Sequence, residues 1–307
     1  MTTFLEVAII AFLWGVAFGF GMPLSMEYYV DNNAPENRGK IGGITYFLAY
    51  LGIFFFGIMT NHDLKTQILG LTLWRAAGLM FILFLKPNYI RSKEVKDPSY
   101  VSIVRERSFF LYFVPWLMFC LINYLSIPIL TELFGEDFAV SSFLIEGLII
   151  GIFAIIGGFL CDMIGRKRII VSGFVMVGLG YAVLSVFPES LISWYFYTIL
   201  DGVAWGMLAV AFLMALWGDL AYEKPSKKYY ALGGLPFLFA NTLQALIGKD
   251  LAKSISVSAV FPLTSLFLFL AVLPLIYAPE TLPEKRIKER EVKKYIEKAK
   301  KIKEKYE

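Results

Sequence analysis

"GGFLCDMIGRKRII", residues 157–170, places charged side chains between two long apolar runs. These side chains are Asp162, Arg166, Lys167 and Arg168. Gly158 and Asp162 are four residues apart, so they share one face if this part of the chain is helical. Gly165 allows a sharp turn directly before the basic residues. The stretch therefore predicts a charged turn between two apolar helices, with an aspartate available for an electrostatic contact.

The composition of the chain agrees with apolar helices on both sides of this turn. Of 307 residues, 58% are hydrophobic and 18% are charged, and the mean hydropathy is +0.64, which is unusual for a soluble domain. A helix needs roughly 18 to 20 apolar residues to cross a bilayer. Runs of about this length occur at 4–27, 41–60, 67–86, 109–131, 138–161, 169–188, 191–217, 229–248 and 257–279.

These runs must be helices in a membrane, because an unpaired backbone group is costly in hydrocarbon and the runs are too long for barrel strands. We therefore predict an all-α polytopic membrane protein with about nine transmembrane helices. Residues 1–3 lack the basic region of a secretory signal, so we expect the first run to remain in the membrane.

Basic residues alternate between the loops. The loops after 4–27, 67–86, 138–161 and 191–217 carry more Lys and Arg than the loops between them. The positive-inside rule then places these loops and the C-terminal tail in the cytoplasm and the N-terminus outside a cell (plasma) membrane. The tail, 280–307, mixes acidic and basic residues, which favours a solvated helix over an anchor on anionic lipid.

Two loops of the sequence share one order of features. "SMEYYVDNNAPENRGKIGG" (25–43) and "LWGDLAYEKPSKKYYALGG" (216–234) each contain a carboxylate, a proline, basic residues and paired glycines. We interpret them as equivalent loops of an internal repeat. The predicted organisation is then a partial N-terminal bundle of three helices, a linker, a complete six-helix bundle and a charged tail, at 1–86, 87–108, 109–279 and 280–307.

Residues 158–168 resemble the G-x3-D-R/K-x-G-x-R/K-R/K loop of the major facilitator superfamily (MFS) of transporters, with Met163 in place of the usual base. "NAPENRG" (33–39) looks like the P-x-x-x-R-G loop after helix 4 of that family, shortened by one residue. "APETLPEK" (278–285) is similar to the P-E-T sequence that closes many sugar porters. The resemblance implies that the nine runs correspond to helices 4 to 12 of a twelve-helix fold, with a shortened N-terminal half.

Two features depart from known MFS subfamilies. "KPNYIRS" (86–92) replaces the P-E-S-P-R sequence of sugar porters, and the run 41–60 lacks the G-P-x-x-G-G pattern of drug–proton antiporters. The resemblance therefore identifies no substrate.

The resemblance implies a role for Asp162, which is contact with the cytoplasmic start of the run 41–60. The free amides and the dipole at a helix start stabilise a carboxylate there, and Gly39, Gly42 and Gly43 would let the two backbones approach. We thus predict a conformational latch made by Gly158, Asp162, Gly165, Arg166, Lys167 and Arg168. In the alternative, the cations lie in a solvated loop and only set the topology.

Asp201 is the strongest candidate for a functional residue within the membrane, because ionisable groups at this depth are expensive. Four polar or aromatic residues share its helix face: Trp194, Tyr197, Thr198 and Trp205. This stripe suits a substrate or a proton, and the alternative is a buried structural pair.

Five further residues are candidates for substrate or proton binding. Glu146 adjoins a stripe of small residues, Gly147, Gly151, Ala154 and Gly158, that suits close helix packing; it lines a cavity or extends outward to water. Arg75 lies in a run that is peripheral in the MFS fold, so it suits a structural pair. Asn123, Asn241 and Gln244 either bind substrate or hydrogen-bond neighbouring helices.

Other chemistry has little support in the sequence. Cys120, Cys161 and the single histidine, His62, form no cluster, so we expect no metal and no cofactor. Catalytic carboxylate pairs and a nucleophile elbow are missing, so we expect no enzyme and no catalytic residue. The net charge of +4 is concentrated in the loops and the tail, and nothing indicates nucleic acid.

The leading hypothesis is a secondary transporter that moves a small polar solute, with or without protons, by alternating access in a lipid bilayer. The competing hypothesis is a truncated, transport-inactive protein derived from an MFS transporter, or one part of a split transporter whose partner supplies the missing helices.

Overall fold

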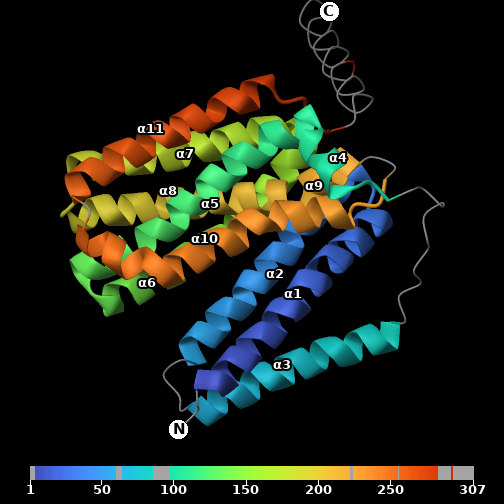
Figure 1. Cartoon of the computed structure of the whole chain (residues 1–307), viewed down its shortest axis with the longest axis horizontal. Coiled ribbons are helices and arrows are strands. Elements are labelled where there is room, and N and C mark those ends of the chain that lie inside the picture. The colour runs from blue at the N-terminus through green and yellow to red at the C-terminus, as the bar shows by residue number, and fades with distance from the viewer. Residues whose placement is uncertain are drawn as a thin grey trace, which may run out of the picture.

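The protein is described by a computed structural model that covers residues 4–59, 64–85, 97–221, 224–254 and 256–282, and position 292. Most of the predicted linker and tail, and His62, lie outside these ranges. Within them every regular element is a helix (Figure 1). The helices are α1 (Phe4–Asn32), η1 (Pro35–Asn37), α2 (Arg38–Met59), α3 (Leu64–Leu85), α4 (Tyr100–Arg105), α5 (Arg107–Phe134), α6 (Glu136–Ile164), α7 (Arg166–Val186), α8 (Leu191–Ala209), η2 (Val210–Leu216), α9 (Trp217–Ala221), α10 (Lys227–Ser254) and α11 (Val257–Tyr277).

The predicted all-α fold is confirmed over the described residues. Six helical segments in this part of the chain are long and apolar enough to cross a bilayer: Arg107–Phe134, Phe138–Ile164, Arg166–Val186, Leu191–Ala221, Lys227–Ser254 and Ser258–Tyr277. They indicate a membrane protein. The helices α1, α2 and α3 coincide with the first three predicted runs, but a bundle of nine transmembrane helices remains a prediction.

Glycines mark both turns of α6. Gly135 precedes the helix with φ +83°, and Gly165 follows it with φ +108°. Residues with a Cβ rarely adopt such φ angles. Glycine therefore allows the sharp turns by which the chain enters and leaves α6. The turn at Gly165 is the charged turn that the sequence predicted, and we call this end of the bundle the charged end.

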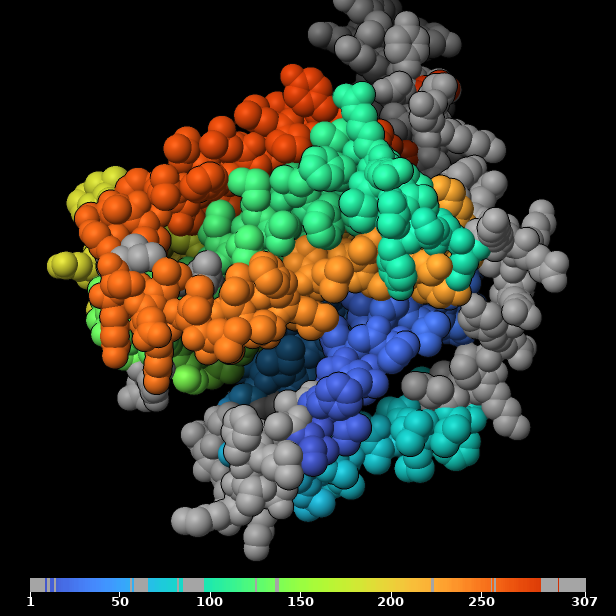
Figure 2. Space-filling view, viewed as in Figure 1, coloured from blue at the N-terminus to red at the C-terminus, as the bar shows by residue number. Residues whose placement is uncertain are grey.

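The six helical segments pack as one bundle, and the three N-terminal helices attach to it unequally. α6 contacts α8, α8 contacts α7, α7 contacts α11, and α5 lies between α11 and α10. α2 packs along α6, and α1 packs on α10. Figure 1 shows α3 apart from the six-helix bundle, and the space-filling view in Figure 2 shows the same separation.

The close contact between α2 and α6 depends on small residues. A Cβ at Gly39 would overlap the carbonyl oxygen of Gly158, and one at Gly43 would overlap the carbonyl oxygen of Ala154. Further along, Gly151 faces Phe47. The predicted small-residue stripe of α6 is therefore confirmed as a packing surface, and it holds α2 at backbone distance.

One helix runs through the centre of the bundle and changes its winding on the way. α8, η2 and α9 form a continuous segment from Leu191 to Ala221, of which the part from Val210 to Leu216 is a π-helix. Most residues of this segment are buried, and from Asp201 to Gly218 all except Leu213 are. Asp201 precedes the π-helix and Asp219 follows it, so a single element joins the middle of the bundle to its charged end.

Candidate functional site

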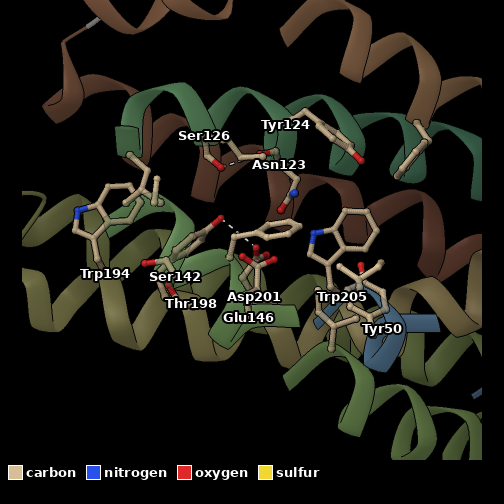
Figure 3. A pocket seen from close by; sticks show the side chains of 18 of the residues that line it. Tyr50, Asn123, Tyr124, Ser126, Ser142, Glu146, Trp194, Thr198, Asp201 and Trp205 are labelled. Atoms are coloured by element: carbon tan, nitrogen blue, oxygen red, sulfur yellow. Dashed lines mark hydrogen bonds between the residues drawn. The ribbon is translucent and has the colours of Figure 1, made fainter. Parts of the chain in front are cut away.

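A cavity of about 420 Å³ lies in the half of the bundle away from the charged end. Five helices contribute to its lining: α2, α5, α6, α8 and α10. The cavity is partly open, and its size is in the range of small-molecule sites. Most of its lining side chains are aromatic or aliphatic, and a few polar groups reach into it (Figure 3).

Two carboxyl groups from different helices share this cavity. Asp201 on α8 is 2% exposed, and Glu146 on α6 lines the same space. Figure 3 draws both carboxyl groups in the middle of the cavity, where they interact electrostatically. The helices can approach because Gly202 faces the backbone of Glu146, where an added Cβ would lie 3.2 Å from the carbonyl oxygen.

Within the described part of the chain, one oxygen of Asp201 has a hydrogen-bond partner and the other has none. The Tyr197 hydroxyl lies 3.3 Å from Oδ2 of Asp201 and 3.0 Å from the Tyr181 hydroxyl. Oδ1 of Asp201 is buried and has no hydrogen-bond partner among the described residues. The same holds for Oδ1 of Asn123 and Oγ of Ser142, which also line the cavity. Because buried polar atoms are nearly always paired, this concentration in one cavity indicates a place for a polar ligand.

Aromatic side chains close the cavity toward the charged end. The ring of Trp205 lies 4.7 Å from that of Phe119 and 6.1 Å from that of Trp116. Trp116 in turn stacks on Phe212 at 4.6 Å. These centroid distances are typical of packed aromatic pairs. The four rings therefore form a packed layer, which we call the aromatic floor, between the two carboxyl groups and the charged end.

The structure brings together Asp201, Glu146 and Asn123 in one cavity. It also places there the four residues that share the helix face of Asp201: Trp194, Tyr197, Thr198 and Trp205. Glu146 lines the cavity, which is the first of its two predicted alternatives; the other is extension outward to water. The remaining candidates are elsewhere. α10 reaches the cavity through Phe237, whereas Asn241 and Gln244 are not among the lining residues and Asn241 is exposed. Arg75 lies exposed on α3, away from the six-helix bundle (Figure 1).

A second constellation occupies the charged end, where Asp162 contacts the start of α2. Its Oδ1 accepts a hydrogen bond from the Gly39 amide at 2.9 Å, and its Oδ2 accepts one from the Lys40 amide at 2.8 Å. The contact that the resemblance implied is therefore present in the structure. The carboxylate neutralises free amides at a helix start, and this ties α2 to α6.

Two arginines and a second aspartate extend this contact into a buried network. Arg166 binds Asp162 at 2.7 Å and Asp219 at 3.0 Å, and Arg38 binds Asp219 at 2.6 Å. The side chains of these four residues are at most 9% exposed. We refer to Asp162, Arg166, Asp219 and Arg38 as the buried clamp. It connects α2, α6, α7 and α9 at one point.

Glu280 supports the buried clamp from the segment after α11. Its carboxylate accepts hydrogen bonds from the amides of Arg166 at 2.8 Å and Lys167 at 3.2 Å, and so it caps the start of α7. Lys167 extends to the carbonyl oxygen of Ile276 at 2.6 Å, and Arg168 is exposed. The three basic residues therefore differ: Arg166 belongs to the packed interior, and Arg168 fits the solvated alternative.

Sequence reasoning did not assign Asp219, Arg38 or Glu280 to the charged turn. A signal was available, because Asp219 is the carboxylate of the repeated loop and Glu280 lies in "APETLPEK". Nothing in the sequence alone indicates that these distant residues lie together at the charged end.

The described residues contain no group of three or more His, Cys, Asp or Glu side chains arranged to hold a metal. Cys120 and Cys161 are buried free thiols. No protein-family model matches the chain, and no curated protein matches it in sequence.

Proposed function

We propose that this protein is a secondary transporter of the MFS type, which moves a small solute by opening one cavity to each side of a membrane in turn. The observation that carries this proposal is the position of the cavity and the buried clamp on one helix. Asp201 faces a partly open cavity, and Asp219, further along the same segment, belongs to the network that seals the other end. This is the arrangement expected of one state of an alternating-access cycle.

The buried clamp supports the proposal because it connects elements that must separate when the charged end opens. Asp162 holds the start of α2 against α6, and Arg38 of α2 binds Asp219. Opening the charged end would break these polar contacts together. The contacts therefore stabilise the closed state, and they can form again when this end closes. We propose that the charged end lies on the cytoplasmic side of a plasma membrane, because basic residues concentrate in the loops at that end.

The π-helix η2 offers a mechanical link between the two sites. Such segments are wider than an α-helix and are frequent at functional positions. Here the π-helix contributes Phe212 to the aromatic floor and leads into α9, which carries Asp219; Met214 within the π-helix packs on Gly42 of α2. A change in its winding would rotate Asp219 relative to Asp201, which would couple the cavity to the lock.

Proton coupling would use the carboxyl groups of Asp201 and Glu146. Ionisable groups at membrane depth are costly and commonly serve in proton relays. No lysine, arginine or histidine is among the described residues that line the cavity. A proton or a cationic solute would therefore supply the missing positive charge.

The proposal can be tested by recording charge movement from proteoliposomes on a solid-supported membrane while solutes and pH are changed. We expect a saturable response with at least one solute. Asp201→Asn and Glu146→Gln should reduce it strongly, and the matched variants Asp250→Asn and Glu132→Gln should not, because Asp250 and Glu132 are exposed. A response that is indifferent to both cavity variants would refute the assignment of the site, and no response to any solute would favour a transport-inactive protein.

A further inference from the structure

The unpaired atoms of the cavity specify the kind of ligand that would complete it. Oδ1 of Asp201 and Oδ1 of Asn123 are hydrogen-bond acceptors, and both are buried with no donor bound to them among the described residues. Ser142 adds a hydroxyl in the same condition. Burying an acceptor without a donor is unfavourable, so a ligand that donates several hydrogen bonds would remove this penalty.

The charge of the cavity indicates the sign of the ligand. Asp201 and Glu146 contribute two carboxyl groups, and the described lining contains no basic side chain to balance them. The buried arginines Arg38 and Arg166 lie at the charged end, away from the cavity, where they are held in the buried clamp. An anionic solute would meet like charge in a medium of low dielectric constant, whereas a cation would be attracted.

The remaining walls suit an apolar body attached to that cation. Trp205, Tyr50 and Tyr124 surround the carboxyl groups on one side of the view in Figure 3, and Trp194 lies on the other. Aromatic faces attract organic ammonium groups and also bury apolar carbon. A sugar or a similar polyhydroxyl solute would leave most of its hydroxyl groups against these rings without partners.

We propose that the cavity binds a small organic cation, specifically an arylalkylammonium ion. Its ammonium group lies among Asp201, Glu146 and the side-chain oxygen of Asn123, and its ring packs against Trp205 and Tyr50. The inference names the substrate class of the transport proposed above and therefore rests on that function, although binding itself can be measured without transport.

The test uses three probes of similar size that differ in charge: 2-phenylethylammonium, 2-phenylethanol and 3-phenylpropanoate. Each is titrated calorimetrically into the full chain in lipid nanodiscs, with empty nanodiscs as the blank. We expect the ammonium ion to bind at least about tenfold more tightly than the alcohol, since charge-assisted hydrogen bonds are stronger than neutral ones, and we expect no saturable binding of the carboxylate. Equal binding of the three probes, preference for the anion or no saturable binding of the ammonium ion would overturn the proposal.

Variants then locate the site. Asp201→Asn and Glu146→Gln should each weaken binding of 2-phenylethylammonium on the order of tenfold to a hundredfold, and Asp250→Asn should leave it unchanged. Each variant is first checked for a single size-exclusion peak and a cooperative thermal transition, and the two cavity variants serve as independent tests if one fails to fold. Unchanged affinity in a folded cavity variant would overturn the assignment.

Sodium chloride in place of potassium chloride provides a further arm, because the same oxygens could attract an inorganic cation. If sodium competes fully with the ammonium ion and also binds in its absence, the proposal of an organic ligand is overturned and the cavity is a metal-ion site. Flux separates this inference from the proposed function. Binding with the expected charge preference but no uptake into proteoliposomes would contradict transport alone, and Asp201-dependent uptake of a solute that is not a cation would contradict the ligand class alone.

Discussion

The starts of α2 and α10 follow the two loops that the sequence predicts to be equivalent, but the protein holds them in different ways. The start of α2 is bound by the buried clamp, whose carboxylates and guanidinium groups are almost completely covered. The start of α10 is bound in part by side chains of the linker before α5, in ion pairs whose side chains are 24–44% exposed. Equivalent sequence features therefore do not imply equivalent contacts.

The contacts at α10 come from the segment Asp97–Glu106, which we call the surface clamp. Lys227 binds Asp97 at 3.0 Å, and Lys224 binds Glu106 at 2.9 Å. Tyr229 lies 2.9 Å from both oxygens of Glu106. A copy of the charged turn is not found at this position within the described residues, and the linker lies there instead.

The two helix starts differ in how strongly their electrostatic contacts stabilise the protein. A broken buried pair leaves an uncompensated charge in an apolar interior and costs several kcal/mol. An exposed pair exchanges one hydrated contact for another and is worth little. We therefore expect the polar contacts at the start of α2 to contribute much more to stability than the ion pairs at the start of α10.

Arg166→Met should have the largest effect. It leaves Asp162 and Asp219 buried without their shared guanidinium group, so we expect a loss of roughly 3–5 kcal/mol in the free energy of unfolding. Thermal unfolding in detergent would show this as a large fall in Tm. Arg168→Met is the matched control, because Arg168 is exposed, and its Tm should stay close to that of the unchanged protein. Similar Tm values for the two variants would contradict the importance of the buried clamp.

Asp162→Asn should have the next largest effect and should also release α2. The amide nitrogen cannot accept from the second of the two backbone amides, so a loss of about 2–3 kcal/mol is expected. A cysteine at Met214, which packs on Gly42, would report the release by faster maleimide labelling in a chain whose Cys120 and Cys161 are alanine. Asp97→Asn, in the surface clamp, should leave the labelling rate unchanged. Equal rates in the two variants would argue against a lock at α2.

Gly158→Ala tests the backbone contact beneath the buried clamp. The added Cβ would overlap the carbonyl group of Gly39, which is backbone and cannot rotate away, so we expect a loss of about 1–3 kcal/mol. At the start of α10, the Cβ of Gly234→Ala would meet only the end of Met22, at 3.6 Å. That variant should keep or slightly raise the Tm. Equal stability of Gly158→Ala and Gly234→Ala would contradict a stabilising backbone contact between Gly158 and Gly39.

Glu106→Gln should have the smallest effect, less than about 1 kcal/mol and weaker in high salt. The hydrogen bond that Lys224 donates to the carboxylate of Glu106 raises the pKa of Lys224 above its ordinary 10.5. The pair therefore contributes stability below pH 10.5, and the contribution is lost as the pH rises through the raised pKa. Unfolding measured from neutral to strongly alkaline pH should show the small difference between Glu106→Gln and the unchanged protein disappear. A persistent difference would show that Glu106 acts through another contact.

Local patterns were sufficient for the turn at Gly165 and for the small-residue stripe of α6. Helix periodicity alone brings Gly158 and Asp162 to one face, and the glycines are the positions where two backbones can touch. Asp201 and its aromatic neighbours were found for the same reason, because a stripe on one helix is visible in one segment of sequence. Asn241 and Gln244 also lie on one helix face, but their spacing does not reveal whether that face meets the cavity.

The helices, their apolar character and the polar positions within them can be derived from the sequence, because they depend on the composition and periodicity of single segments. Which distant residues meet is a property of the folded bundle. Arg38, Asp162, Arg166 and Asp219 come from four helices, and the cavity that joins Glu146 to Asp201 exists only after α6 and α8 pack. Such partners are set by the relative position of helices, which depends on many side chains at once and on no single stretch of sequence.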